Sequence, residues 1–329
     1  KESKHILEEI KKANKILLNC HRGPDPDSIG SALAMYEVLK QMGKDAKIVC
    51  PSEELFDNIS YLKNFDKIQK NVDFNNFDFT KFDLFITMDS SSWDMVTSLR
   101  DFRKPNIRAI VIDHHVTNTY YGDINIVDTK TTSVAEILYL IFKDWKVKID
   151  NITANYLLTG IIGDTGAFRF PNSKQKTFRI AAELMDKGGD KDEIISHIYG
   201  SESFNLIRFY GEALSNVKLD KESKFVWTAI PYEVYKKLDA PSVARESTSS
   251  LFAQVVEGTN FGFVAVEQEP NKVSISFRSR TGVDTSKIAA ELGGGGHVYA
   301  SGAKIEGLSF DKAVEKVLET ARKFAKENV

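Results

Sequence analysis

The sequence contains few of the residues that are typical of secreted or membrane proteins. Only two of its 329 residues are cysteine, Cys20 and Cys50, and their spacing matches no zinc-binding pattern. We therefore expect free thiols in a reducing compartment rather than a disulfide framework. No apolar run approaches the ~20 residues that span a bilayer, and the charged segment 1–12 lacks the apolar core of a signal peptide. These absences predict a soluble, cytoplasmic protein with no membrane partner.

The chain also lacks an excess of charge of either sign. Its 44 lysines and arginines nearly balance its 46 aspartates and glutamates, so the formal net charge is −2. Such a protein has no general attraction for polyanions, and we expect no binding of long duplex nucleic acid. Hydrophobic residues make up 42% of the chain, and a domain usually takes ~100–200 residues. The sequence therefore predicts about two globular domains.

In the first half of the chain, short apolar runs alternate with segments of helical periodicity. This pattern predicts an α/β fold in which helices cover both faces of a parallel sheet. The expected strands are 15–20, 46–50, 82–88, 107–112 and 124–127, and the expected helices are 28–42, 131–144, 152–162 and 175–187. We assign this first domain to residues 1–188.

The pattern changes from Leu214 onward. Hairpin-like strands are expected at 225–230, 262–267 and 273–278, with helices at 232–238 and from Phe310 to the C-terminal end. This arrangement predicts a smaller α+β domain with its own core. We assign it to residues 215–329, after a helical linker at 189–214.

Acidic and imidazole side chains follow three predicted strands and one predicted helix of the first domain. The set consists of His21, Asp25, Asp27, Asp89, Asp113, His114, His115 and Asp164. Because the carboxyl ends of parallel strands meet at one edge of a sheet, we expect these groups to converge. Taken singly, each segment could be only a turn or a helix cap. Taken together, the carboxylates would raise one another's pKa values unless cations neutralised them.

The composition of this set indicates the metal and the reaction. Carboxylates and imidazoles without thiolates favour manganese or magnesium over structural zinc. Two such ions ~3.5–4 Å apart form the clamp that many enzymes use for displacement at phosphorus. The residues therefore predict hydrolysis of a phosphate ester, with no need for a serine or cysteine nucleophile.

These motifs resemble those of the DHH phosphoesterase superfamily, which has His-x-x-x-Asp-x-Asp, a lone Asp after a strand, Asp-His-His and a final Asp in this order. The resemblance implies two Mn²⁺ ions, with Mg²⁺ or Co²⁺ as alternatives. It implies that His21, Asp25 and Asp89 hold one ion, and that Asp27, Asp89, His114 and Asp164 hold the other. His115 would face the scissile phosphate as hydrogen-bond donor or general acid, and Asp113 would orient an imidazole.

The second predicted domain resembles the DHHA1 domain in two places. Segment 293–302 resembles its Gly-Gly-Gly-His signature, and segment 276–279 resembles its arginine-bearing strand. The resemblance implies a substrate-binding role for Arg278, His297, Gly295, Gly296 and Ser301. A plain glycine loop and a solvated arginine are the alternative. The signature disfavours the related soluble inorganic pyrophosphatases.

Within the DHH/DHHA1 group, the chain resembles the stand-alone nanoRNases, or oligoribonucleases. The resemblance implies hydrolysis of linear dinucleotides and very short oligonucleotides, such as pApA and pGpG, to 5′-mononucleotides, and of 3′-phosphoadenosine 5′-phosphate (pAp). A homodimer would be compatible with this group. One alternative is a cyclic di-AMP phosphodiesterase in second-messenger signalling, and another is a non-catalytic nucleotide sensor. Segment 165–170 also resembles this group, so Phe168 or Arg169 would contact a base or phosphate, or else pack a turn.

Overall fold

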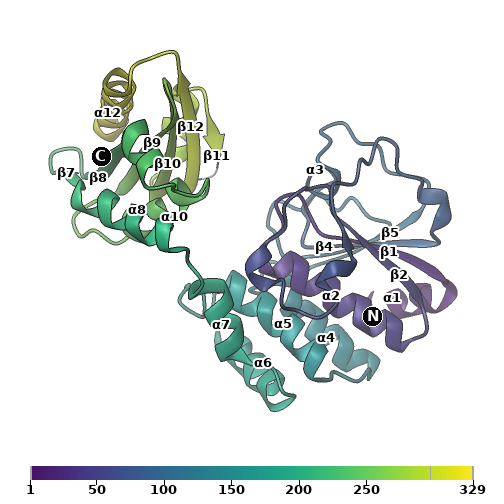
Figure 1. The fold of residues 1–329 in the computed structure, drawn as a ribbon. Coiled ribbons are helices and arrows are strands. Elements are labelled where there is room, and N and C mark those ends of the chain that lie inside the picture. The colour runs from purple at the N-terminus through teal and green to yellow at the C-terminus, as the bar shows by residue number, and fades with distance from the viewer. Residues whose placement is uncertain (1, 297, 328–329) are drawn as a thin grey trace. The chain divides into compact units, whose positions relative to one another are not determined.

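The chain folds into two compact units, residues Lys1–Ser201 and Glu202–Val329 (Figure 1). The computed structural model describes residues 2–296 and 298–327. Two helices lie in the range of the expected linker, and they pack in different units. Helix α7 (Lys191–Tyr199) packs on α5 of the first unit, whereas α8 (Phe204–Ser215) packs on α10 and β8 of the second.

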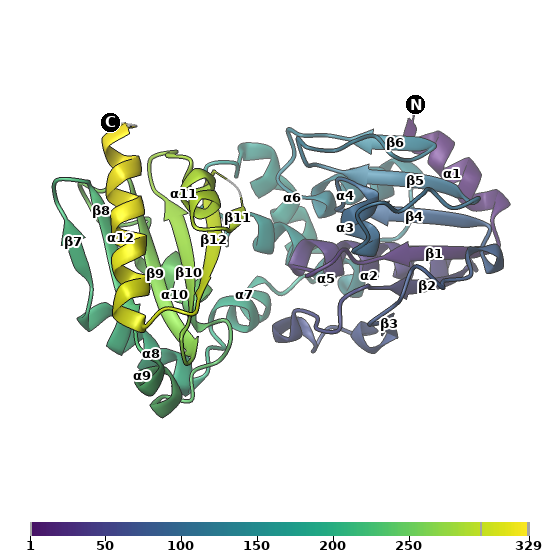
Figure 2. The ribbon, with the colours of Figure 1, turned by 90° about the horizontal axis from the view of Figure 1, so that it is seen from above.

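The first unit is built on a six-stranded parallel sheet, so the expected fold class is confirmed (Figure 2). Its strands are β1 (Lys15–Asn19), β2 (Asp45–Val49), β3 (Ile68–Gln69), β4 (Leu84–Met88), β5 (Arg108–Asp113) and β6 (Ile124–Val127). The order across the sheet is β3-β2-β1-β4-β5-β6, and every neighbouring pair is parallel. From β1 the strand order runs outward through β2 to β3 on one side, and from β4 it runs outward through β5 to β6 on the other. Open α/β sheets bind ligands at such a switch in strand order, here between β1 and β4.

One face of this sheet is covered by two layers of helices. The helices are α1 (Glu2–Lys12), α2 (Pro26–Gln41), α4 (Val134–Trp145), α5 (Asn151–Asp164) and α6 (Gln175–Asp186). Helices α2 and α4 contact the sheet, and α5 packs across both of them. The helix backbones approach closely, because a Cβ atom on Gly30 would lie 2.5 Å from the carbonyl oxygen of Tyr156. Since α2 lies between the sheet and α5, it is buried on nearly all sides.

The other face of the sheet is covered mainly by aromatic side chains from loops. Leu17, Val49 and Phe85 of the strands pack there against Phe74 and the short helix α3 (Trp93–Thr97). Aromatic side chains carry much apolar area each, so a few loops suffice to bury this face. Helices thus lie on both faces of the sheet, as expected, but the aromatic face is covered mainly by loops and the short helix α3.

The second unit has a mixed six-stranded sheet with helices on both faces. Its strands are β7 (Lys218–Asp220), β8 (Phe225–Ile230), β9 (Phe261–Glu269), β10 (Lys272–Ser279), β11 (Gly295–Gly296) and β12 (Ala300–Glu306), in the order β11-β12-β10-β9-β8-β7. Only β8 and β9 among the described pairs are parallel.

Two separate apolar clusters form the core of the second unit, one on each face of the sheet. Helices α11 (Thr285–Glu291) and α12 (Phe310–Glu327) cover one cluster, and α8, α9 (Tyr232–Lys237) and α10 (Ala244–Phe252) cover the other. The three strands and two helices expected in this unit are therefore confirmed. Across the described part of the chain, no helix has both the length and the apolar character needed to cross a bilayer.

Candidate functional site

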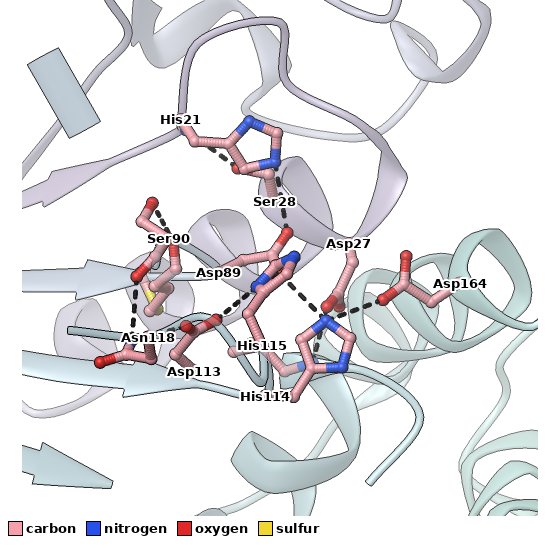
Figure 3. A network of polar contacts seen from close by, with 12 residues as sticks. His21, Asp27, Ser28, Asp89, Ser90, Asp113, His114, His115, Asn118 and Asp164 are labelled. Atoms are coloured by element: carbon pink, nitrogen blue, oxygen red, sulfur yellow. Dashed lines mark hydrogen bonds and ion pairs between the residues drawn. The ribbon is translucent and has the colours of Figure 1, made fainter. Parts of the chain in front are cut away.

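The predicted metal ligands gather at the carboxyl edge of the parallel sheet, around the ends of β1, β4 and β5 (Figure 3). Three groups of side chains could each hold a metal ion, because their candidate ligand atoms lie within 4.8 Å of one another. These groups are His21, Asp25 and Asp89; Asp27, His114 and Asp164; and Asp89, His114 and His115. The structure thus brings together the whole predicted ligand set, while the role of each residue stays a prediction.

His21 and Asp25 lie at the two ends of the turn between β1 and α2. Nδ1 of His21 is 2.9 Å from the carbonyl oxygen of Arg22, so Nδ1 carries the proton and Nε2 is free to face Asp89 Oδ2 at 3.4 Å. Asp25 is the N-cap of α2, and its Oδ1 accepts two backbone N–H groups of the first turn, each at 2.9 Å. Its Oδ2 lies 3.8 Å from His21 Nε2. Asp25 therefore serves as a cap with one oxygen and faces the cluster with the other.

Asp89 lies between the two halves of the cluster. It follows β4 with a backbone φ of 53°, a left-handed conformation that costs a residue with a side chain ~1 kcal/mol. Its backbone N–H donates to the carbonyl oxygen of Ile112 at 3.0 Å, which ties the turn to β5. Its Oδ2 faces His21, and its Oδ1 lies 3.4 Å from Nε2 of His114. This position suits a carboxylate that bridges two cations.

The second half of the cluster joins residues from three helices and a loop. Nε2 of His114 lies 3.2 Å from Oδ2 of Asp164, which is the last residue of α5. Asp27, in the first turn of α2, accepts hydrogen bonds from the backbone N–H groups of Val134 at 2.6 Å and Ala135 at 3.0 Å. These donors belong to the first turn of α4, so the positive end of the helix dipole stabilises Asp27 as an anion.

The donor set fits a divalent cation. Oδ1 of Asp89 is buried, and none of the described residues donates a hydrogen bond to it, which leaves this oxygen available to a metal ion. The surrounding groups are carboxylate oxygens and imidazole nitrogens, while Cys20 and Cys50 are buried in the apolar core. Carboxylate oxygens suit magnesium and manganese, and the lack of thiolates in the cluster differs from the usual ligand set of structural zinc.

Burial and mutual repulsion perturb the protonation of the cluster. Burial, followed by the charge of Asp89, raises the pKa of Asp27 to about 7. Burial, followed by the charges of Asp27 and Asp89, also places the pKa of Asp164 well above its usual range. Burial lowers the pKa of His114, but the contact with Asp89 and the charges of Asp27, Asp89 and Asp113 together outweigh this effect and raise the pKa to about 9. Divalent cations would take the place of these protons and relieve the repulsion.

Asp113 and His115 form a hydrogen-bonded pair beside the cluster. Asp113 is buried at the end of β5, and its Oδ1 lies 2.7 Å from Nδ1 of His115, whose side chain is 43% exposed. Because the carboxylate accepts the Nδ1 proton, Nε2 of His115 is left for a substrate. The other oxygen of Asp113 accepts a hydrogen bond from Nδ2 of Asn118 at 2.6 Å. Sequence reasoning missed Asn118, whose one signal is its place in the loop that follows Asp-His-His.

The second unit places the described part of its predicted substrate site at one end of the sheet. Strand β11 (Gly295–Gly296) pairs with β12 at Ser301, and β10, which carries Arg278, flanks β12 on the other side. Nε of Arg278 donates to Oγ of Ser250 at 3.2 Å. The buried hydroxyl of Ser301 donates to Oγ1 of Thr285 at 3.0 Å.

The glycines before and in β11 differ in whether the structure leaves space for a side chain. A Cβ atom on Gly296 would lie 2.6 Å from Cα of Ser301, and one on Gly294 would lie 2.1 Å from a carbonyl oxygen of β12, so strand packing alone excludes side chains there. At Gly295 no atom lies within 4 Å of that position, so packing does not exclude a side chain there. His297, also predicted to bind substrate, lies outside the described residues.

The segment directly after α5 is conformationally strained. Residues 166–168 all have φ values between 56° and 65°, and two of them are not glycine. Such strain is concentrated at functional sites. Phe168 stacks on Phe178 with ring centroids 5.2 Å apart, and the guanidinium of Arg169 lies 5.3 Å from the ring centroid of Tyr199. Both side chains therefore have packing partners inside the first unit.

Comparison with known families agrees with the motifs. Residues 15–161 match the DHH family, N-terminal domain, and residues 252–327 match the DHHA1 domain. The chain therefore belongs to the DHH family of phosphoesterases, and its second unit carries the DHHA1 domain.

Similar proteins cover nearly the whole chain. The bifunctional oligoribonuclease and PAP phosphatase NrnA of Thermus thermophilus is 30% identical, with 98% of this chain and 94% of that protein aligned. Its namesake from Bacillus subtilis is 27% identical, with 98% of each chain aligned. The crystal structure of an exopolyphosphatase-related protein from Bacteroides fragilis is 26% identical and superposes with a TM-score of 0.87 over 99% of this chain and 97% of that one. Both units of the chain thus have counterparts in single proteins.

Proposed function

We propose that the protein is a manganese-dependent phosphodiesterase that hydrolyses linear dinucleotides and very short oligonucleotides to 5′-mononucleotides in the cytoplasm. The observation that carries the proposal is the pair of candidate ligand groups that meet at Asp89, whose buried Oδ1 accepts no hydrogen bond from the described residues. The similarity to oligoribonucleases over nearly the full chain supports the substrate class. Hydrolysis of pAp belongs to the same proposal.

The cluster would hold two metal ions. One ion would be held by His21, Asp25 and Asp89, and the other by Asp27, His114 and Asp164. Asp89 would join the second set as well, because its Oδ1 lies 3.4 Å from Nε2 of His114. Bound divalent cations at this edge would polarise the phosphodiester and stabilise the charge that develops during displacement. Beside them, Asp113 accepts the Nδ1 proton of His115, which would leave Nε2 of His115 for the substrate. His115 therefore donates a proton or a hydrogen bond to the reacting phosphate ester.

In the second unit, Arg278, His297, Gly295, Gly296 and Ser301 would bind a nucleotide of the substrate. Arg278 supplies a guanidinium for a phosphate, and the free space beside the Cα atom of Gly295 leaves room for a ligand. The hydroxyl of Ser301 is engaged with Thr285, so its contribution would be the shape of the β11–β12 segment. A local site of this kind suits a small substrate better than a long polymer.

A substrate panel tests the proposal. Purified protein is treated with a chelator, and hydrolysis of pApA, pAp and cyclic di-AMP is then measured with and without added manganese. The proposal requires manganese-dependent release of AMP from pApA, at a higher kcat/KM than for cyclic di-AMP. A preference for cyclic di-AMP would favour the signalling enzyme instead. Failure of manganese to accelerate pApA hydrolysis would contradict the proposal.

An Asp89→Asn variant separates an enzyme from a nucleotide sensor. The substitution removes the charge of the candidate bridging carboxylate while keeping a side chain that tolerates the left-handed backbone. An enzyme loses turnover in this variant. A sensor would keep both its nucleotide affinity and its biological effect.

A further inference from the structure

The side-chain amide of Asn118 contacts the buried carboxylate of Asp113 next to the candidate metal cluster (Figure 3). We propose that Asn118 is a positioning residue that acts through Asp113 to hold the imidazole of His115 against the reacting phosphate. This inference rests on the proposed phosphodiesterase function, because it assigns a task to a residue beside that site.

The hydrogen bonds around Asn118 fix the orientation of its amide. Nδ2 donates to Oδ2 of Asp113 at 2.6 Å and to the carbonyl oxygen of Ser90 at 3.3 Å. Oδ1 accepts the backbone N–H of Tyr120 at 2.7 Å. A carboxylate and a carbonyl only accept, and a backbone N–H only donates, so a flipped amide would lose all three bonds. The donor therefore faces Asp113.

Asp113 depends on this donor. Its side chain is fully buried, and none of the described lysines or arginines forms an ion pair with it. Of the described residues, His115 bonds to Oδ1 and Asn118 bonds to Oδ2. Without Asn118, a buried carboxylate oxygen would be left without a donor, which is unfavourable. The carboxylate would then turn or admit water, and the imidazole that it holds would move with it.

Asn118 also connects the two loops that carry the site. Its contact to Ser90 reaches the loop that begins with Asp89, and the neighbouring Thr119 bonds through its backbone N–H to the carbonyl oxygen of Ser91 at 2.9 Å. Its own backbone N–H donates to the carbonyl oxygen of His115 at 3.2 Å. The residue thus sets the position of the Asp113–His115 pair relative to the loop of the candidate bridging carboxylate.

The proton balance shows why this position matters. Release of a 5′-mononucleotide breaks the bond between phosphorus and the 3′-oxygen of the preceding nucleotide. A water molecule supplies the oxygen that bonds to phosphorus, and the departing 3′-oxygen takes a proton from Nε2 of His115. The imidazole is then neutral, and its Nδ1–H still donates a hydrogen bond to Asp113. The proton that the attacking water releases afterwards restores the proton on Nε2. Proton donation is effective only at hydrogen-bond distance, so a displaced ring loses it.

Two variants of Asn118 and one control test the proposal. Asn118→Asp has the same shape and still accepts the N–H of Tyr120, but it places an oxygen against Asp113, whereas Asn118→Ala removes all three side-chain hydrogen bonds. Thr119→Val is the matched control, because it removes the bond from Oγ1 of Thr119 to the carbonyl oxygen of Ser91 in the same loop without touching Asp113. Circular dichroism and manganese titration verify that each variant is folded and binds metal.

The expected result is a loss of kcat on pApA. We expect a decrease of about 10- to 100-fold for Asn118→Ala and a larger decrease for Asn118→Asp, since general acids typically contribute 10²–10⁴-fold. KM and the manganese concentration for half-maximal rate should stay within about twofold, because a positioning residue of this kind acts on the transition state. Thr119→Val should retain the wild-type kcat.

Two further readouts distinguish positioning from a general loss of structure. Bis(p-nitrophenyl) phosphate has a leaving group that departs without a proton, so the Asn118 variants should hydrolyse it at nearly the wild-type rate. The double variant Asn118→Ala/His115→Ala should be no slower on pApA than His115→Ala alone. Equal losses on both substrates, or multiplicative losses in the double variant, would overturn the proposal.

The two proposals fail in different ways. If the wild-type protein hydrolyses pAp or cyclic di-AMP but not pApA, the proposed substrate is wrong, and the Asn118 variants are compared on the substrate that is hydrolysed, whose leaving group is also a sugar oxygen. If the wild-type protein hydrolyses none of these esters, both proposals are overturned. If it hydrolyses pApA and the Asn118 variants match it, only the role of Asn118 is overturned.

Discussion

Adding a single methyl group at Gly160 should disturb both stability and the candidate metal site. Gly160 lies in α5 where this helix crosses α2 and α4. A Cβ atom there would lie 2.4 Å from Oδ1 of Asp27 and 2.7 Å from Cβ of Ala135. Both distances are shorter than atoms can tolerate, and Asp27 is already held by two backbone hydrogen bonds from α4. The Gly160→Ala variant must therefore move helices or displace the carboxylate.

The size of the effect follows from two opposing terms. Alanine favours a helix over glycine by about 1 kcal/mol. Overpacking of a closely packed interior costs about 1–3 kcal/mol, and weakening the hydrogen bonds of Asp27 adds about 1 kcal/mol. We expect a net loss of about 1–3 kcal/mol in the free energy of unfolding. For a unit of this size, this corresponds to a decrease of roughly 2–12 °C in Tm.

Calorimetry and manganese titration measure the two consequences. The Gly160→Ala variant should unfold at a lower temperature and should need more manganese for half-maximal pApA hydrolysis, because displaced Asp27 is a candidate ligand. Gly211→Ala is the matched control, since Gly211 lies in α8, is exposed and would place its Cβ with no atom within 4 Å. We expect that control to gain about 0.5–1 kcal/mol from helix propensity. A Gly160→Ala protein as stable as the wild type, with an unchanged manganese requirement, would refute the reasoning.

Three further outcomes are expected. The affinity for manganese should rise as the pH rises toward about 9. The reason is that the pKa of His114 is raised to about 9, and its proton must leave before Nε2 can bind metal. An affinity that falls as the pH rises would contradict this expectation. Asp89→Asn should lower turnover by more than about 100-fold and should also lower Tm, since His21 and His114 lose the carboxylate charge that they pair with; retained turnover would exclude the bridging role. Arg278→Ala should raise KM for pApA about 10-fold with kcat within about threefold, and an equal fall in kcat and kcat/KM would instead place Arg278 in transition-state stabilisation.

The parallel strands were the most predictable part of the fold. Strands β1, β4 and β5 are almost entirely buried, so their sequences are continuous apolar runs that end abruptly in polar residues. That abrupt change also made the ligand set predictable, because its carboxylates and histidines lie at or shortly after the ends of strands or at an end of a helix. The positions of these residues along the chain were therefore enough to predict that their side chains converge at one edge of the sheet.

Other elements had no comparable signal. Strand β3 (Ile68–Gln69) is two residues long at the edge of the sheet, and periodicity cannot be read from two residues. Helix α10 (Ala244–Phe252) is rich in serine and threonine, which are poor helix formers, and tertiary packing of Ala244 and Phe252 stabilises it. Strand β12 (Ala300–Glu306) begins inside the glycine-rich segment 293–302, whose composition indicates a loop. In each case tertiary context outweighs local preference.

Asn118 shows the corresponding limit for the site. Its contact with Asp113 depends on a loop in which Tyr120 adopts a left-handed backbone with a φ of 53°. No spacing rule connects such a loop conformation with a side-chain amide. Sequence patterns therefore identified the groups at the ends of strands, but not the residue that holds one of them in place.

The order of strands in the first sheet has a consequence for how the protein is made. The central strand β1 is synthesised first, yet its neighbour β4 and the helix α5 that carries Asp164 come much later in the chain. A nascent chain that has emerged only through α4 cannot contain the complete ligand set. Such non-local pairing slows folding, and the complete ligand set forms only after α5 has docked. Metal capture by the complete set should therefore follow the docking of α5, and the helices α6 and α7 of this unit are synthesised later still.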